Sequence, residues 1–422
     1  MKTAKFFILL FLLIFGTYFF GKPYLYELRV NIEKYTQRNI PQNTGIHKLA
    51  LILFKKASIL LPNYDHFALN RQPLELGVGT YKSASDSILQ AYQQIYVGNN
   101  TEIITALKNS TPGTVINILP GKYSFEGSYL VFNASGNEFA PIILRANSIG
   151  EVIFDMNLHE GILLSSSYVK IENIIFQGRK TPHDSIEHAI HIVGNADYVE
   201  ISHNEFINFN AHIKSNGIPD KNGQRIFPDN VKISYNNFYN QWKRNTISPA
   251  SPIDVVGGKN WVINNNFIAD FAKYGQQGRG VTYGLFLKGA SENGLIENNL
   301  VNCSWQVPHT SPNDVRIGIS LGNGGTGKRF CMDNSQCNFE HYNGTIRNNT
   351  VLNCKNDISI YINKGKKTTI YNNLIINSLG IEVRWPASSA HIYGNILDGR
   401  IKVTHGASAI LTENSKSVDY FQ

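Results

Sequence analysis

Short apolar stretches separated by Asn recur along the chain between residues 168 and 395. In each copy, apolar and polar positions alternate, one or two Asn follow, and a second short apolar stretch comes next. The alternation predicts strands, and Asn predicts the tight turn between them, because Asn tolerates left-handed backbone and bonds locally. The copies of this unit are residues 199–207, 231–239, 261–268, 295–301, 345–351, 369–375 and 391–397.

Most copies return after roughly 22 to 33 residues, a spacing typical of solenoids, in which one coil cannot bury its apolar face alone. The pattern predicts an all-β fold, a right-handed parallel β-helix over residues 96–422. Equivalent Asn side chains of successive coils should bond to one another as a ladder. The amphipathic stretch at 101–109 is expected to form a helix that covers the open first coil.

The N-terminus differs from the rest of the chain. Residues 6–20 hold no charged side chain, which predicts a signal peptide or a signal anchor over residues 1–21. Residues 22–95 form a basic, partly helical segment, with a helix expected over 83–95. We expect an exported protein, either secreted or held in the cell envelope through membrane association of this N-terminus.

The net charge of +8 belongs mainly to the N-terminus, because residues 1–60 hold nine Lys or Arg and two Glu. The solenoid is therefore close to neutral, which argues against a nucleic-acid partner. Nothing in the sequence calls for an oligomer, and we expect a monomer.

Four Cys occur in the chain. Cys331 and Cys337 close a small loop, which in an exported protein predicts a disulfide. Cys303 and Cys354 follow the Asn turns of successive coils and are expected either in the core or in a second bridge. A metal site is disfavoured, because no Cys-x-x-Cys pair accompanies them.

Counting back from each Asn turn aligns the preceding strands into one sheet, whose residues stack at about 4.8 Å. With aliphatic residues inward, two neighbouring outward columns emerge. The first is predicted to hold His191, His212, Asp254, Phe286, Ser320, Tyr361 and Glu382. The second is predicted to hold Val193, Lys214, Val256, Lys288, Gly322, Asn363 and Arg384.

Titratable side chains thus gather on one outer face. Lys288 and Asp254, one coil and two residues apart, should have α-carbons roughly 8 Å apart. A carboxylate, imidazoles and amines within reach of one another predict an acid/base site. Insertions at 215–229 and 323–341 are expected to wall the site. The outer face of a sheet is commonly polar, so a purely structural role for these residues is the alternative.

The run from Gly284 to Asn299, which contains Lys288, then Ser291 and Asn293, resembles a motif of pectate-lyase-like β-helix proteins. It is most similar to polysaccharide lyase family six, the chondroitinase B and alginate lyase group. The resemblance implies that Lys288 is the base that removes the proton α to a uronic carboxylate. It also implies an assisting Arg, for which Arg316 is the nearest candidate.

The chain departs from that family where calcium ligands are expected. Acidic residues lie seven and five positions before the family's Lys, where this chain has Val281 and Tyr283. We therefore expect no cofactor; calcium remains an alternative without its usual ligands. A substrate carboxylate would then be neutralised by Arg, Lys or His.

The sequence hypothesis is a polysaccharide lyase that acts on a uronic-acid-containing polymer. Lys288 is assigned as base, Lys214 and Arg316 face the carboxylate, and the remaining polar residues act as acid or bind substrate. The residues in this last role are His191, His212 and Asp254, with Phe286, Tyr361 and Arg384 as further substrate contacts. A non-catalytic glycan-binding or cell-envelope protein is the alternative, and a glycoside hydrolase or a uronan epimerase is a second one.

Overall fold

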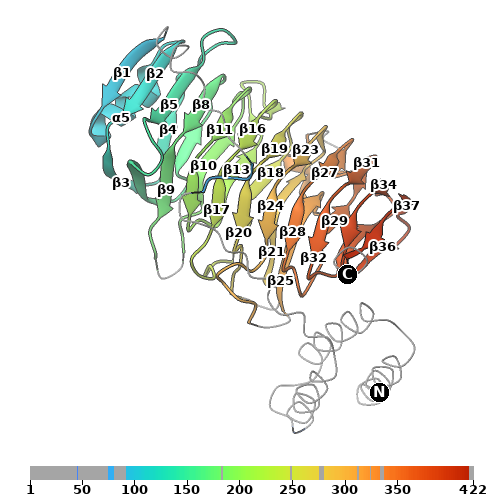
Figure 1. Cartoon of the computed structure of the whole chain (residues 1–422). Helices are drawn as coiled ribbons and strands as arrows, with labels where there is room; N and C mark the ends of the chain where they lie inside the picture. Colours follow the sequence, from blue (N-terminus) through green and yellow to red (C-terminus); the bar gives the residue numbers. More distant parts are fainter. Residues whose placement is uncertain are drawn as a thin grey trace, which may run out of the picture.

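The computed structural model describes residues 45, 75–79, 92–181, 184–247, 250–274, 280–310, 313–323, 325–332 and 337–417. The described chain winds into a parallel β-helix, as the Asn repeat predicts (Figure 1). Three long parallel sheets of 12, 11 and 10 strands, here called A, B and C, run along the solenoid, and each inner coil contributes a strand to each of them in turn. Every coil shares its apolar interior with its neighbours, which is why the fold grows by addition.

Sheets A and B meet at the predicted Asn turns. Sheet A consists of β1 (Gln93–Val97), β2 (Thr114–Ile118), β5 (Ile142–Ala146), β8 (Val169–Glu172), β11 (Glu200–Ser202), β16 (Lys232–Ser234), β19 (Val262–Asn264), β23 (Leu295–Glu297), β27 (Thr345–Arg347), β31 (Thr368–Tyr371), β34 (Ser389–Tyr393) and β37 (Ser408–Thr412). Sheet B consists of β3 (Gly121–Gly127), β6 (Val152–Leu158), β9 (Ile174–Gly178), β12 (Glu205–Ile207), β17 (Asn237–Tyr239), β20 (Phe267–Ala269), β24 (Leu300–Asn302), β28 (Thr350–Leu352), β32 (Leu374–Ile376), β35 (Ile396–Leu397) and β38 (Ser415–Lys416).

Sheet C carries the residues predicted to form the site. It consists of β4 (Leu130–Phe132), β7 (Ile162–Leu164), β10 (His188–Val193), β13 (Ala211–Asn216), β18 (Ile253–Val256), β21 (Gly280–Lys288), β25 (Asp314–Leu321), β29 (Ile360–Asn363), β33 (Gly380–Arg384) and β36 (Arg400–Thr404). Smaller elements lie at the turns between sheets C and A: the hairpin β14 (Ile218–Pro219) and β15 (Arg225–Ile226), the short strands β22 (Ser291–Glu292), β26 (His341–Tyr342) and β30 (Gly365–Lys366), and the 3-10 helix η1 (Lys328–Phe330).

Asn side chains are stacked at all three corners of the coil. At the corner between A and B, Asn266 donates its amide to Asn299 and accepts from Asn236, and this pattern continues along a buried ladder. The members of this ladder are Asn204, Asn236, Asn266, Asn299, Asn349, Asn373, Asn395 and Asn414. A shorter buried ladder of Asn302, Asn353 and Asn377 joins B to C. An exposed ladder of Asn230, Asn260, Asn293 and Asn343 joins C to A.

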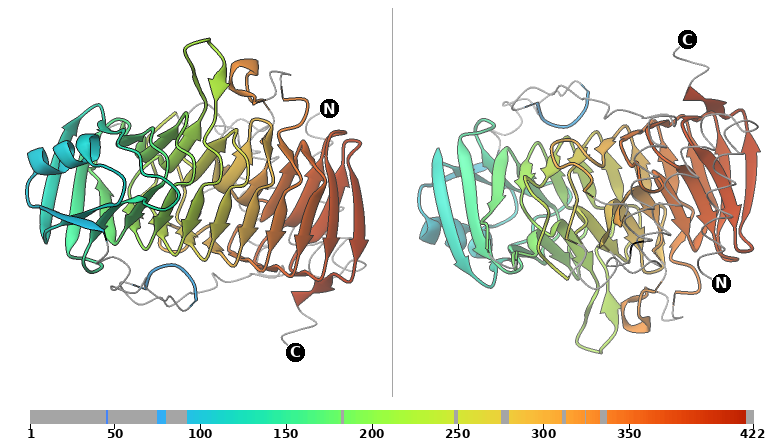
Figure 2. Two further views of the ribbon diagram at one scale, coloured as in Figure 1. Left: turned by 90° about the horizontal axis from the view of Figure 1, so that it is seen from above. Right: turned by 90° about the horizontal axis from the view of Figure 1, so that it is seen from below.

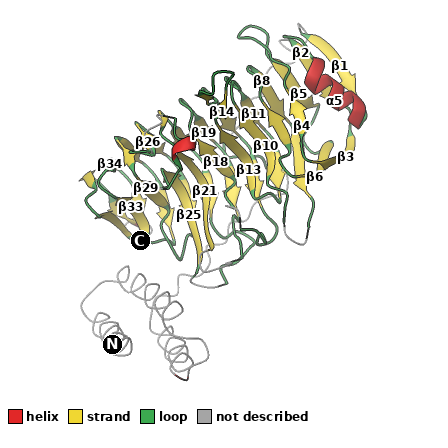
Figure 3. Cartoon of the chain, turned by 180° about the vertical axis from the view of Figure 1, so that it is seen from behind, coloured by secondary structure: helices red, strands yellow, loops and turns green. Residues whose placement is uncertain are grey.

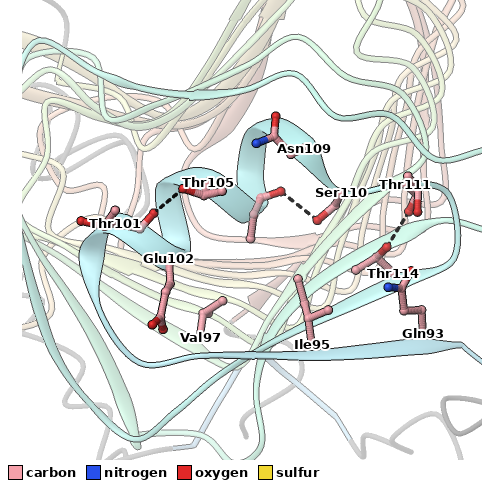
Figure 4. Close-up of a pocket in the computed structure, with 11 residues that line it drawn as sticks. Gln93, Ile95, Val97, Thr101, Glu102, Thr105, Asn109, Ser110, Thr111 and Thr114 are labelled. Carbon is pink, nitrogen blue, oxygen red and sulfur yellow. Dashed lines mark hydrogen bonds between the residues drawn. The ribbon is translucent and has the colours of Figure 1, made fainter.

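The first coil is capped by α5 (Asn100–Asn109), as expected. The Asn99 side chain accepts a hydrogen bond from the Glu102 backbone N–H, and this capping contact explains where the helix begins. A hollow of about 410 Å³ lies between α5 and β1, lined by Glu102, Ile95 and Val97 among others (Figure 4). It is at the end of the solenoid, away from Lys288.

The N-terminal predictions mostly fall outside the described residues, including the signal or anchor segment. Residues 93–95, the end of the helix predicted over 83–95, instead belong to strand β1, because they pair in register with β2. Within the described ranges, no helix has the length and hydropathy needed to cross a membrane.

Residues 75–79 form a strap on the outside of the solenoid at the corner between A and B. The Gly77 N–H donates to Asn237 Oδ1 and the Val78 N–H donates to the Asn265 carbonyl. Gly77 has φ +59°, and a Cβ there would meet the Asn265 carbonyl oxygen at 2.3 Å, so the close approach requires glycine. In the left view of Figure 2 this blue segment lies across the molecule from the β14–β15 hairpin.

Candidate functional site

The outer face of sheet C gathers the polar residues that the sequence predicts, with one change of register. Backbone pairing aligns His191 with Lys214, Lys214 with Asp254, and Asp254 with Phe286. The same column continues through Ser320, Tyr361 and Glu382, as predicted. Val256 pairs with Lys288 in the neighbouring column.

The predicted position of His212 is wrong by two residues. Ser215 occupies the inward position filled by Ile192 and Val255 in adjacent coils, so β13 continues to Asn216. His212 instead packs edge-on against Phe209 and Phe238, and its Nε2–H donates to the Tyr239 carbonyl. Burial lowers the pKa of His212 to about 3, so it is a neutral core residue.

The shift brings Lys214 into the centre of the site. Its Nζ lies 2.6 Å from Asp254 Oδ1, and the Asp254 side chain is 5% exposed. Burial acts to raise the pKa of Asp254, but the ammonium groups of Lys214 and Lys288 outweigh it and lower that pKa below its ordinary value. Asp254 is therefore a carboxylate held between two amines, not a proton donor.

Lys288 ends strand β21 on the same face. Its Nζ lies 4.7 Å from the centre of the Phe286 ring. Burial, assisted by the Lys214 cation, lowers the pKa of Lys288, and the carboxylates of Asp254 and Glu340 oppose this only in part. A lysine in these surroundings reaches its neutral, basic form more readily than a lysine in water.

His191 lies at the other end of this group. Its Nδ1 faces Glu160 Oε2 at 3.2 Å and its Nε2 faces Asn216 Oδ1 at 2.8 Å. The Asn216 amide nitrogen donates to the Gly217 carbonyl, which turns its oxygen toward the ring. Both ring nitrogens thus face side-chain oxygens, which fix the orientation of the ring. The neighbouring His188 lies edge-on at 5.1 Å, and burial lowers its pKa to about 3.

Two insertions border the site where the strands of sheet C end. The β14–β15 hairpin and the segment containing η1 lie side by side in both views of Figure 2, and the Arg225 guanidinium lies 5.4 Å from the Phe330 ring centre. Figure 3 shows η1 beside the middle coils, whereas α5 lies at the end. The predicted walls at 215–229 and 323–341 therefore contact each other beside the strand ends.

Glu340 fixes the second insertion next to Lys288. Its carboxylate accepts hydrogen bonds from the Gly289 backbone N–H at 2.9 Å and from the Thr326 hydroxyl at 2.6 Å. The predicted Cys331–Cys337 disulfide is present and packs with Ala290, two residues beyond Lys288. The second bridge, left open by the sequence, joins Cys303 to Cys354.

Arg316 is not brought to the site. It pairs with Thr282, six residues before Lys288, which corresponds to about 20 Å along the strand. Its guanidinium is 0% exposed and donates to both Asp314 oxygens and to the carbonyls of Cys303 and Val307. Arg316 therefore holds the loop before β25, and its assignment to the substrate carboxylate does not fit this geometry.

The predicted sugar-binding aromatics are largely covered. Phe286 is 0% exposed and Tyr361 is 8% exposed, so neither presents an open ring face. Arg384 lies in the column of Lys288 three coils further on, about 14 Å away. Its guanidinium lies 4.7 Å from the Trp385 ring centre. Trp385 is 38% exposed and its ring also lies 4.8 Å from the His405 ring, so this pair is more accessible than Phe286 or Tyr361.

Val281 and Tyr283 occupy the positions where the resembled family has acidic ligands, and neither supplies a carboxylate. Among the described residues, no group of three or more His, Cys, Asp or Glu is arranged to hold a metal ion. The side chains next to Lys288 are the amine of Lys214, the carboxylates of Asp254 and Glu340, and the Phe286 ring. Asp254 is ion-paired to Lys214, and Glu340 accepts from Gly289 and Thr326.

Several site residues escaped the sequence reasoning. His188 begins strand β10, before the part of that strand that the sequence alignment covered. Asn216 ends strand β13, whose register was misplaced; the alternation around Ser215 was the signal that could have placed it. Glu160 and Glu340 lie in turns and insertions, where the repeat gives no alignment. Their contacts with His191 and Gly289 depend on the path of those loops.

No protein-family model matches the chain, and no curated protein matches it. Among solved structures, an alginate lyase from Paenibacillus sp. str. FPU-7 is similar with a TM-score of 0.47 and 14% identity, over 77% of this chain and 95% of that chain. A PL6 family polysaccharide lyase from Pseudopedobacter saltans has a TM-score of 0.44 and 14% identity, over 76% of this chain and 92% of that chain.

A mannuronic acid specific polysaccharide family 6 lyase from human gut microbiota has a TM-score of 0.44 and 14% identity, over 77% of this chain and 83% of that chain. These structures include members of the family that the Lys288 motif resembles.

Proposed function

We propose that this protein is a polysaccharide lyase that cleaves a uronic-acid-containing polymer by β-elimination, with Lys288 as the base. The observation that carries the proposal is the group formed by Lys288, Lys214 and Asp254 on the outer face of sheet C. Lys214 and Asp254 are ion-paired at 2.6 Å, and Lys288 interacts electrostatically with both.

The reaction needs a base for the proton α to the uronic carboxylate and positive charge where the enolate develops. Lys288 supplies the base, because its lowered pKa increases the neutral fraction near neutral pH. Lys214, whose side chain is 18% exposed, supplies the cation that replaces a metal ion at the carboxylate. Asp254 holds Lys214 in place through their ion pair. His191 lies one strand further from Lys288 and offers a polar side chain to the substrate.

Hydrolysis is less well supported by the same face. A glycosidase needs two carboxyl groups in acid and base roles. Asp254 is ion-paired to Lys214, and Glu340, which is 0% exposed, accepts hydrogen bonds from Gly289 and Thr326. Both carboxylates are thus engaged in structural contacts.

Export and attachment through the N-terminus belong to the same proposal. A charge-free stretch over residues 6–20 and two disulfides support an oxidising compartment. The substrate would then be a polymer outside the cytoplasm.

The direct test is a panel of alginate, pectate and glycosaminoglycans, followed at 235 nm for unsaturated uronic ends. Wild type should generate absorbance on at least one polymer. Lys288→Ala should abolish this absorbance. Lys232→Ala, at an exposed lysine on sheet A, should retain the wild-type rate. Both variants should keep the wild-type Tm.

Two results would overturn the lyase assignment. Binding to a polymer without any absorbance indicates a glycan-binding protein. Deuterium incorporation from D₂O at the α-carbon without chain cleavage indicates an epimerase, which shares the proton-removal step. Full activity of Lys288→Ala would remove the base assignment.

A further inference from the structure

Tyr283 lies on the outer face of sheet C because the inward pattern of β21 changes at Gly284. Both Gly284 and Leu285 face the core: a Cβ on Gly284 would contact Phe271 and Val301, and Leu285 is 0% exposed. Tyr283 and Phe286 therefore both point outward, with ring centres 5.3 Å apart and planes nearly perpendicular.

The Tyr283 hydroxyl is directed toward the end of the strand that holds Lys288. It donates to Asn323 Oδ1 at 2.8 Å. Asn323 follows Gly322, which occupies the position of Lys288 in the next coil, since Leu287 pairs with Leu321. The ammonium of Lys288 and the ring of Tyr283 thus contact the same Phe286 ring, at 4.7 and 5.3 Å from its centre.

The protonation states of the two groups are complementary. Burial, and then the neighbouring Tyr361 and Asp357, raise the pKa of Tyr283 above its ordinary value. Burial lowers the pKa of Lys288. The same low-polarity surroundings therefore favour a neutral phenol and a neutral amine together, which are the forms of an acid and a base ready to react.

An acid is needed because the leaving sugar departs as an alkoxide. Arg316, the group that the family resemblance assigns near the base, is 0% exposed and bound to Asp314 and loop carbonyls. Asp254 is held as a carboxylate by two lysines. Two other hydroxyl groups lie in this column: Ser320 donates to the carbonyls of Gly322 and Tyr361, and the Tyr361 phenol, one coil further, interacts with Arg384. Tyr283 is the hydroxyl-bearing ring in contact with Phe286.

We propose that Tyr283 is the general acid of the elimination, donating its phenolic proton to the glycosidic oxygen while Lys288 removes the α-proton. This inference rests on the lyase function proposed above. Asn323 acts as a positioning residue that holds the hydroxyl before substrate binds.

The step balances in atoms and charge. The electrons of the C5–H bond form the C4–C5 double bond, and the proton moves to Lys288 Nζ. The C4–O4 bond breaks, and O4 takes the proton from Tyr283 Oη. The resulting ammonium and phenolate return to neutral amine and phenol by net proton transfer through water after product leaves.

The test compares two substrates in the full-length protein: the polymer, and a uronoside with 4-nitrophenolate as the leaving group at C4. Tyr283→Phe should lower kcat on the polymer by about 100- to 10,000-fold, the usual contribution of a general acid. It should remain within a few-fold of wild type on the nitrophenyl substrate, because that leaving group needs no proton. Lys288→Ala should be inactive on both.

Tyr239→Phe is the matched control, since it removes a half-buried phenol that donates to Glu205 on sheet B. It should leave both rates unchanged. Equal losses of Tyr283→Phe on both substrates would show a positioning role and overturn the acid assignment, as would an unchanged rate on the polymer. If wild type produces no unsaturated ends from any polymer, the proposed lyase function itself fails.

Discussion

Electrostatic coupling to Lys214 and Asp254 contributes to the pKa of Lys288, the residue assigned as the base. Asp254 stabilises the protonated form of Lys288 and thus acts to raise its pKa, whereas Lys214 destabilises that form and acts to lower the pKa. The acid side of the kcat/KM profile should report the loss of a proton from Lys288, with activity rising as pH increases.

Two substitutions should move that acid limb in opposite directions. Lys214→Met removes a nearby cation, so the pKa of Lys288 should rise and the limb should shift to higher pH. Asp254→Asn removes an anion that stabilises protonated Lys288, so the limb should shift to lower pH. The measurement is kcat/KM against pH for the three proteins; shifts in the same direction would contradict the coupling.

At the residue scale, the sequence predicted most of this face. His191, Asp254 and Lys288 were placed correctly because aliphatic positions and Asn turns define the register in their coils. Lys214 was misplaced because Ser215, a small polar residue, fills an inward position that alternation reserves for an aliphatic side chain. Arg316 was misjudged because its partners, Asp314 and the 303–308 loop, are set by tertiary contacts that no periodicity reveals.

At the scale of elements, the Asn ladder holds adjacent coils together where the strands are short. Asn266 is 0% exposed; its amide nitrogen donates to the carbonyls of Ile233 and Asn264 and to Asn299, and its oxygen accepts from Asn236. The repeat predicted this ladder. It did not predict the ladder at Asn302, Asn353 and Asn377, because those residues end strands of sheet B whose following loops differ in length.

Replacing Asn266 by Ala should therefore lower the free energy of unfolding by about 2 to 4 kcal/mol, since several buried backbone groups lose their partner. Denaturant titration monitored by circular dichroism measures the change. Asn264→Ala is the matched control in the same coil, because the Asn264 side chain donates only locally, to Asn265 Oδ1. Equal destabilisation by both substitutions would contradict the role of the ladder.

At the scale of the whole molecule, covalent links add to the stacking. Cys303 and Cys354 join residues 51 apart in sequence, whereas Cys331 and Cys337 are 6 apart. A link that closes the longer loop restricts the unfolded chain more. Cys303→Ala with Cys354→Ala should thus lower the free energy of unfolding by about 2 to 4 kcal/mol.

The pair Cys331→Ala and Cys337→Ala supplies the comparison, and its effect on global unfolding should be smaller. Its effect on activity should be larger, because that bridge packs beside Ala290 next to Lys288. Thermal unfolding and turnover on the cleaved polymer, measured for both double variants, show which disulfide contributes more to stability and which contributes more to activity.

The column on sheet C combines a periodic backbone with side chains that never repeat. Coils follow one another at about 4.8 Å, a length comparable to one sugar of an extended polymer. A chain lying along the axis meets the side chains of His191 and Lys214 in successive coils, whereas Asp254, Phe286 and Ser320 in the following coils are buried beneath this face. Sliding by one sugar therefore mismatches every contact at once. The surface should therefore bind the polymer in a single register. The polymer should be cut at one defined distance from its bound sugars and released between cuts.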